Sequence, residues 1–168
     1  MGVFSISLAQ ENTFTFTDTH YDPDGSIHRT IEKTITSPVS KTGLEFYKKN
    51  FHIAKTLPEI LLNNEYQNDT IVILYDNNKP NDFRENWSNT CIYDSHHRLV
   101  SYSFSGCLVC SLAKFNYSIH YNDLGQVSSI NNSLGAKDAF EMTWDGSDNI
   151  TRVQIFHFGH LTRDITRK

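Results

Sequence analysis

The sequence lacks the features by which several classes of protein are recognised. No apolar run reaches the roughly 18 residues of a membrane-spanning helix, so no transmembrane segment is expected. Lys and Arg number 15 against 19 Asp and Glu, a formal net charge of −4 that argues against a nucleic-acid partner bound through a basic patch. The motifs HExxH, Gly-x-Ser-x-Gly and GxxxxGK followed by Ser or Thr are missing. The sequence therefore predicts no cofactor and gives no motif for an enzyme.

Cysteine is also scarce, with three residues in the chain. Cys107 and Cys110 form a CxxC pair, and Cys91 stands alone. A redox CxxC usually opens a helix, whereas strand-like residues flank this one. A zinc site would need a fourth ligand. The histidines that could supply it are His96, His97 and His120. Free thiols are the favoured interpretation, and a disulfide is the main alternative if the protein is exported.

The acidic turns lack the spacing of a calcium site. Around Asp22 and Asp24, an EF-hand loop would need acidic residues where the chain has His20 and Ile31. Paired carboxylates for glycoside hydrolysis are brought together by the fold, so a carboxylate-dependent hydrolase stays open as an alternative. The free carboxylates that it would draw on are Glu65, Glu85 and Glu141. No metal ligand and no catalytic residue is predicted.

What the chain does contain favours β-structure. It has 11 Phe and 8 Tyr, many Thr, Ser and Asn, and little Ala, which is typical of strands and turns. A length of 168 residues fits a single domain, residues 1–168. Residues 1–9 have two interpretations, the remnant of a signal peptide or a first strand with period-two alternation. Location at the cell surface or in the periplasm is slightly favoured over the cytoplasm.

Local patterns predict the elements of the first half of the chain. Residues 13–36 alternate Phe with Thr, break at Asp22-Pro23-Asp24-Gly25 and resume alternation, which predicts a β-hairpin. Apolar residues at helical spacing predict a small helical insert near residues 41–65, with a second helix start at Thr56.

Later segments complete the predicted fold. The apolar run 70–76 predicts a central strand buried on both faces, and residues 77–89 form a loop by composition. Strands and turns alternate over residues 90–156, and the polar tail after Phe156 predicts an edge strand or a frayed end. The expected fold class is mainly β, a curved antiparallel sheet of consecutive hairpins with the helical insert.

One seven-residue turn pattern occurs four times, at 21–27, 93–99, 121–127 and 144–150. An aromatic residue holds position one, Asp or Asn position two, and an aliphatic residue position seven. Position two can close an Asx-type turn, and position five requires positive φ, which Gly adopts freely and His or Asp tolerate. The turn residues at positions two and five are Asp22 and Gly25, Asp94 and His97, Asn122 and Gly125, and Asp145 and Asp148.

The pattern Tyr-Asp-x-x-Gly-polar-aliphatic is similar to the YD repeat of the RHS and teneurin proteins. The resemblance covers four short, degenerate copies, mostly within residues 90–156, and His97 and Asp148 stand where the family has Gly. In that family many copies build a β-shell around or beside another polypeptide. Four hairpins make at most one curved sheet. The resemblance implies no catalytic residues.

The loop 77–89 contains the most prominent candidate for binding a partner. Trp87 lies there beside Phe83 and Arg84, in a segment otherwise mostly of polar residues, and would either cap the core or contact a ligand. The sequence thus predicts a non-enzymatic binding or interaction protein, exported or surface-associated, with a protein or carbohydrate partner. An immunity-type protein that neutralises a toxin is the first alternative, and a hydrolase is the second.

Overall fold

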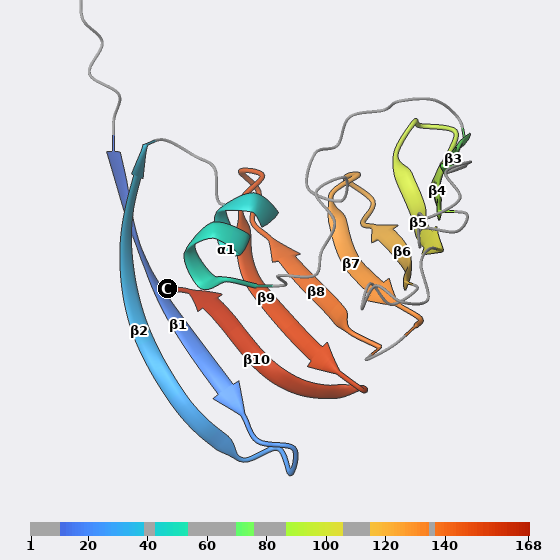
Figure 1. Ribbon diagram of the computed structural model, residues 1–168. Helices are drawn as coiled ribbons and strands as arrows, with labels where there is room; N and C mark the ends of the chain where they lie inside the picture. The colour runs from blue at the N-terminus through green and yellow to red at the C-terminus, as the bar shows by residue number, and fades with distance from the viewer. Residues whose placement is uncertain (1–10, 39–42, 54–69, 76–86, 106–114, 135–136) are drawn as a thin grey trace, which may run out of the picture.

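The computed structural model describes residues 11–38, 43–53, 70–75, 87–105, 115–134 and 137–168. These residues form ten strands and one helix, shown in Figure 1. The helix is α1 (Leu44–Phe51). The strands are β1 (Glu11–Tyr21), β2 (Ile27–Pro38), β3 (Thr70–Tyr75), β4 (Trp87–Tyr93), β5 (Leu99–Ser105), β6 (Phe115–Tyr121), β7 (Val127–Asn132), β8 (Ala139–Trp144), β9 (Ile150–His157) and β10 (His160–Arg167).

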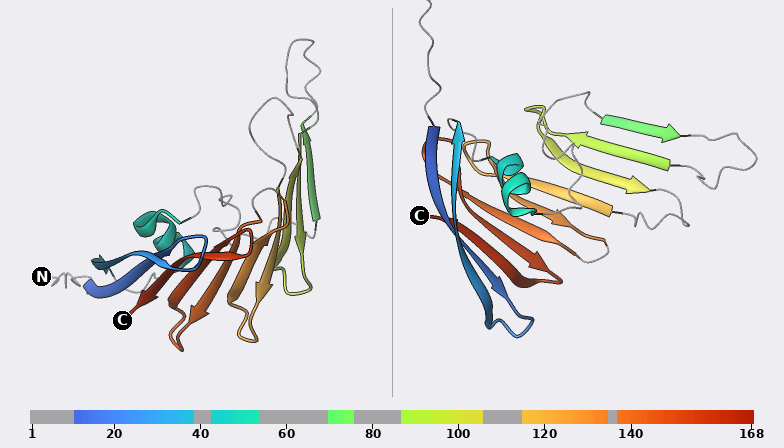
Figure 2. Two further views of the ribbon diagram at one scale, coloured as in Figure 1. Left: turned by 90° about the horizontal axis from the view of Figure 1, so that it is seen from below. Right: turned by 60° about the vertical axis from the view of Figure 1, so that its left-hand side comes forward.

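The strands form a single antiparallel sheet in the order β2-β1-β10-β9-β8-β7-β6-β5-β4-β3. The sheet is strongly curved, and α1 lies on its concave side, as the left view of Figure 2 shows. This arrangement confirms the predicted fold class, a curved antiparallel sheet of hairpins with a small helical insert.

The β1–β2 hairpin follows from the alternation of its residues. Thr side chains on one face pair across the strands, with Oγ1–Oγ1 distances of 3.2 Å for Thr13–Thr36 and 3.4 Å for Thr15–Thr34. On the opposite face Phe14 pairs with Ile35. Period-two alternation therefore separates a hydroxyl face from an apolar face that points to α1.

The helix α1 packs an aromatic cluster onto the apolar face of β1. Phe16 is fully buried, and its ring centroid lies 5.1 Å from that of Phe51, 5.7 Å from Phe46 and 5.8 Å from Tyr47. Edge-on and tilted rings at these distances add to the stabilisation that comes from burial alone. The core continues along the concave face through Ile165 and Val153, both completely buried.

Two predictions about strand position are wrong. The apolar strand β3 lies at the end of the sheet and, among the described residues, pairs with β4 only. The polar strand β10 lies inside the sheet, between β1 and β9. The polarity of β10 is misleading because its charged residues are neutralised within the fold. Arg152 on β9 donates from Nε and Nη2 to the carboxylate of Asp164, and Asp164 is only 8% exposed.

The predicted loop 77–89 is partly wrong as well. Residues 87–89 belong to β4, which starts at Trp87 and pairs with β3. The hydrophilic composition of the segment concealed the start of a strand. Residues 76–86, the second predicted helix and residues 1–9 lie outside the described part of the chain.

Candidate functional site

The four repeated turns share one backbone geometry. In each of them the N–H of position two donates to the carbonyl oxygen of position six at 2.9 Å. Position five has positive φ in every copy, at 86° for Gly25, 59° for His97, 78° for Gly125 and 59° for Asp148, the conformation that the alignment assigns to it. The strand register shifts directly before the position-one aromatic in all four hairpins. Each copy is therefore the same bulged hairpin.

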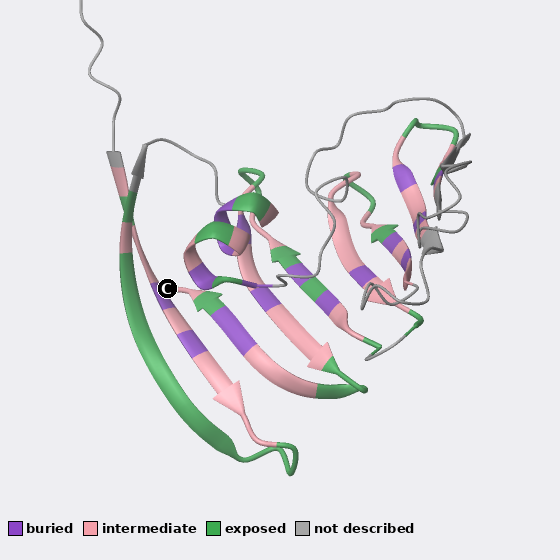
Figure 3. Cartoon of the chain, in the orientation of Figure 1, coloured by how far each residue is buried: buried purple, intermediate pink, exposed green. Residues whose placement is uncertain are grey.

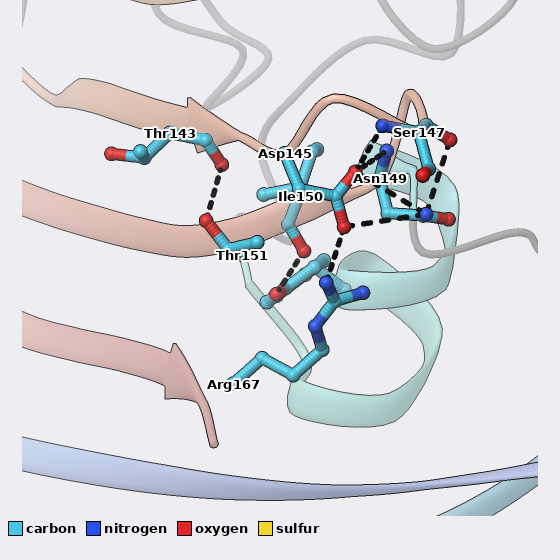
Figure 4. A network of polar contacts seen from close by, with 8 residues as sticks. Thr143, Asp145, Ser147, Asn149, Ile150, Thr151 and Arg167 are labelled. Atoms are coloured by element: carbon cyan, nitrogen blue, oxygen red, sulfur yellow. Dashed lines mark hydrogen bonds and ion pairs between the residues drawn. The ribbon is translucent and has the colours of Figure 1, made fainter.

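Strand direction places three of these turns at the same ends of the strands. Because neighbouring strands alternate in direction, the turns at 93–99, 121–127 and 144–150 lie side by side, and the turn at 21–27 lies at the opposite ends of the strands (Figure 1). In the three neighbouring turns the side-chain oxygen at position two accepts two backbone N–H groups. Figure 4 shows this for Asp145, which accepts from Ser147 at 2.8 Å and from Asn149 at 3.1 Å.

Adjacent turns are joined by a repeated hydrogen bond. The hydroxyl of Tyr121 donates to the carbonyl of Leu99 at 2.8 Å, and Nε1 of Trp144 donates to the carbonyl of Val127 at 2.7 Å. In both cases the position-one aromatic of one copy bonds to the position-seven carbonyl of the copy before it.

The helix α1 completes this series. The carbonyl of Ile150 is the position-seven carbonyl of the last copy, and it accepts a hydrogen bond of 2.8 Å from the hydroxyl of Tyr47. Tyr47 is fully buried, and this burial raises the pKa of its hydroxyl. The helix thus supplies the aromatic donor that the next hairpin would supply.

The carboxylates of these turns have structural roles. The side chain of Arg98, together with its backbone N–H and that of His96, lowers the pKa of Asp94 to about 2. The backbone N–H of Asn149 and the guanidinium of Arg167 lower the pKa of Asp145 to about 2. Both groups are ionised and hydrogen-bonded within their own turn, so neither has the raised pKa of a catalytic acid.

A charged cluster fastens the C-terminal end of α1 to the sheet. Arg163 on β10 contacts Asp18 with Nε–Oδ1 and Nη2–Oδ2 distances of 2.8 and 2.6 Å, and its Nη1 donates to the carbonyl of Phe51 at 2.7 Å. Lys33 on β2 donates to the carbonyl of Asn50 at 2.5 Å. Both cations also act favourably on the negative end of the helix dipole.

Burial and charge set the protonation of this cluster. Burial raises the pKa of Asp18, but the hydrogen bond and charge of Arg163, with His20, outweigh it and leave the pKa below its usual value. Nε2 of His20 lies 3.2 Å from Oδ1 of Asp18. Burial lowers the pKa of His20, and Arg163 and Arg29 lower it further against the attraction of Asp18. The lowered pKa favours the neutral form of His20. Within the cluster, Arg163 and Lys33 make the hydrogen bonds to the helix.

The strand β2 forms an open end of the sheet. Among the described residues it pairs with β1 only, and residues 23–34 are exposed, as Figure 3 shows along almost the whole strand. Ile27 is 64% exposed and Ile31 is 42% exposed. The register places Arg29, Ile31 and Lys33 on the face that carries α1, because their partners on β1 are His20, Asp18 and Phe16. We call residues 27–33 of this strand the β2 edge.

The β2 edge is rich in positive charge within an acidic protein. Its one carboxylate, Glu32, forms an ion pair with Lys168, whereas the guanidinium of Arg29 lies near the lowered-pKa His20. Exposed isoleucines next to Arg29, along an open strand, can pair with an extended segment that has apolar and acidic side chains. The sequence showed this strand but not its exposure, because period-two alternation predicts one buried face.

The predicted partner-binding residues are only partly placed. Trp87 is the first residue of β4, and Phe83 and Arg84 lie outside the described residues. Of the carboxylates considered for a hydrolase, Glu141 is exposed on β8 and pairs with Gln154 of β9, while the other two are not described. Cys91 is a buried free thiol whose pKa is raised by burial.

Comparisons with known proteins identify no relative of this chain. The chain matches no family model, and no curated protein or solved structure is significantly similar to it. Within the described residues, no group of three or more His, Cys, Asp or Glu is arranged to hold a metal ion. No described helix is long and apolar enough to cross a membrane.

Proposed function

We propose that the protein is a non-enzymatic interaction protein that binds an extended segment of a protein partner at the β2 edge. The observation that carries the proposal is a 12-residue strand at the end of the sheet with Ile27 and Ile31 exposed. Unpaired main-chain groups of such a strand template the addition of another strand, and alternate side chains then give specificity.

Charge defines the chemistry of the partner. On the α1 side the β2 edge presents Arg29, Ile31 and Lys33 in alternation. A bound segment would place an apolar residue against Ile31 and a carboxylate beside Arg29, which favours an acidic, extended peptide. Neutralisation of a toxin would be one case of such an interaction. We also propose kinship of the four turns with YD repeats, which the shared bulged geometry supports, and an exported or surface location.

A peptide library tests the proposal. Display selection on the whole protein should enrich extended peptides that alternate apolar and acidic residues, and their binding should shift NMR resonances of residues 27–33. Ile31→Lys should weaken this binding at least tenfold and leave the melting temperature nearly unchanged, because Ile31 is 42% exposed.

Leu124→Lys is the matched control. Leu124 is 78% exposed on a turn, so the variant adds the same charge to an exposed apolar site away from β2. Equal loss of binding in both variants, or peptide shifts that map to other strands, would refute the assignment. Concentration-dependent dimerisation that Ile31→Lys abolishes would identify a second copy of the chain as the occupant instead.

A further inference from the structure

The turn between β9 and β10 brings two histidines together. His157 and His160 are direct partners across this hairpin. The two residues between them, Phe158 and Gly159, have φ values of 50° and 82°, as a tight two-residue hairpin turn requires. Directly opposed residues of an antiparallel pair have Cβ atoms about 4.5–5.5 Å apart on the same face. The two imidazoles therefore start from neighbouring points and can converge on one ion.

Asp138 fixes the orientation of one of these rings. Its Oδ1 lies 2.7 Å from Nδ1 of His157, and the ring of Phe158 contacts the His157 ring edge-on at 4.6 Å. When Nδ1 donates its proton to the carboxylate, the lone pair is on Nε2, which is the nitrogen available to a metal. A carboxylate behind a histidine is the arrangement that positions metal-ligating imidazoles in many proteins.

The pair is also accessible. The side chain of His157 is 49% exposed, and His160 is exposed. This arrangement differs from the four-ligand zinc site that the cysteine pattern of the sequence suggested. It consists of two histidines on one hairpin and needs no cysteine.

We propose that His157 and His160 form a surface site for a divalent transition-metal ion, with Asp138 as the positioning residue of His157. Imidazole ligands suit Cu²⁺, Ni²⁺ and Zn²⁺, with Cu²⁺ bound most tightly, whereas Ca²⁺ and Mg²⁺ prefer oxygen ligands. Two protein ligands leave coordination positions for water or for a side chain of a partner. Each ligating ring nitrogen must offer a free lone pair to the metal ion.

Paramagnetic NMR tests the site in the whole protein. Substoichiometric Cu²⁺ should broaden the amide resonances of residues 156–161 first, and His160→Ala should abolish this local broadening. The control His96→Ala removes an exposed histidine beside His97 on another turn and should leave the broadening unchanged. Circular dichroism and thermal melts establish that both variants are folded.

Calorimetry with Ni²⁺ tests the role of Asp138. Asp138→Asn should weaken Ni²⁺ binding at least tenfold, as loss of a carboxylate behind a metal-bound histidine does. Broadening centred on His96 and His97 or on the cysteines, or persistence in His160→Ala, overturns the site. Unchanged Ni²⁺ affinity in Asp138→Asn overturns the positioning role.

Discussion

The substitution Tyr47→Phe removes one oxygen atom and with it the hydrogen bond to the carbonyl of Ile150. Tyr47 and Ile150 are both completely buried. The variant therefore leaves a buried carbonyl without its donor, which costs about 1–3 kcal/mol. For a chain of this length each kcal/mol lowers the melting temperature by about 2–4 °C, so we expect a fall of roughly 2–12 °C.

Urea denaturation followed by circular dichroism measures this change. The matched control is Tyr21→Phe, the same substitution at the position-one aromatic of the first turn. This turn lies at the opposite ends of the strands from the other three. Tyr121→Phe removes the equivalent hydrogen bond and should also lower the free energy of unfolding. The decrease should be smaller than for Tyr47→Phe, because Tyr121 is only partly buried. Equal stability of Tyr47→Phe and the wild-type protein would refute the idea that α1 replaces a hairpin.

Three further substitutions probe the charged cluster around Arg163 and the repeated turns. Asp18→Asn should destabilise the protein by about 2–4 kcal/mol in urea, because it leaves Arg163 without its buried partner, whereas Glu32→Gln in an exposed pair should have no measurable effect. The pKa of His20 is lower in the folded protein than in the unfolded chain, so its contribution to stability is complete above pH about 6.5 and declines as the pH falls. His20→Asn should therefore reduce the loss of stability between pH 7 and pH 5. Gly125→Val should cost about 1–2 kcal/mol at φ 78°, whereas Gly146→Val, without positive φ, should melt close to wild type.

Local structure could be predicted from the sequence where a few neighbouring residues determine it. The Asp-Pro-Asp-Gly turn and the alternation of Phe and Thr define the β1–β2 hairpin. Apolar residues at helical spacing likewise indicate α1. Each of these signals lies within about ten residues.

Strand order depends on contacts between distant residues and could not be predicted. The polar strand β10 lies beside β1 because Arg163 and Asp18, 145 residues apart, neutralise each other. The hydrogen bond of Tyr47 to Ile150 spans 103 residues, so the sequence indicates a core aromatic but not its donor role. Exposure of the β2 edge follows from its place at the end of the sheet, which alternation cannot reveal.

The position of β10 has a consequence for the order of folding. In the strand ladder of the described residues, the β1–β2 hairpin joins the rest of the sheet only through β10. The hairpin is synthesised before β10, and this strand partner follows more than a hundred residues later, so the pairing has a high contact order and should be slow. A nascent chain in which β10 has not yet left the ribosome would hold the β1–β2 hairpin without its partner in the sheet. Pairing of this hairpin with the other described strands therefore awaits β10.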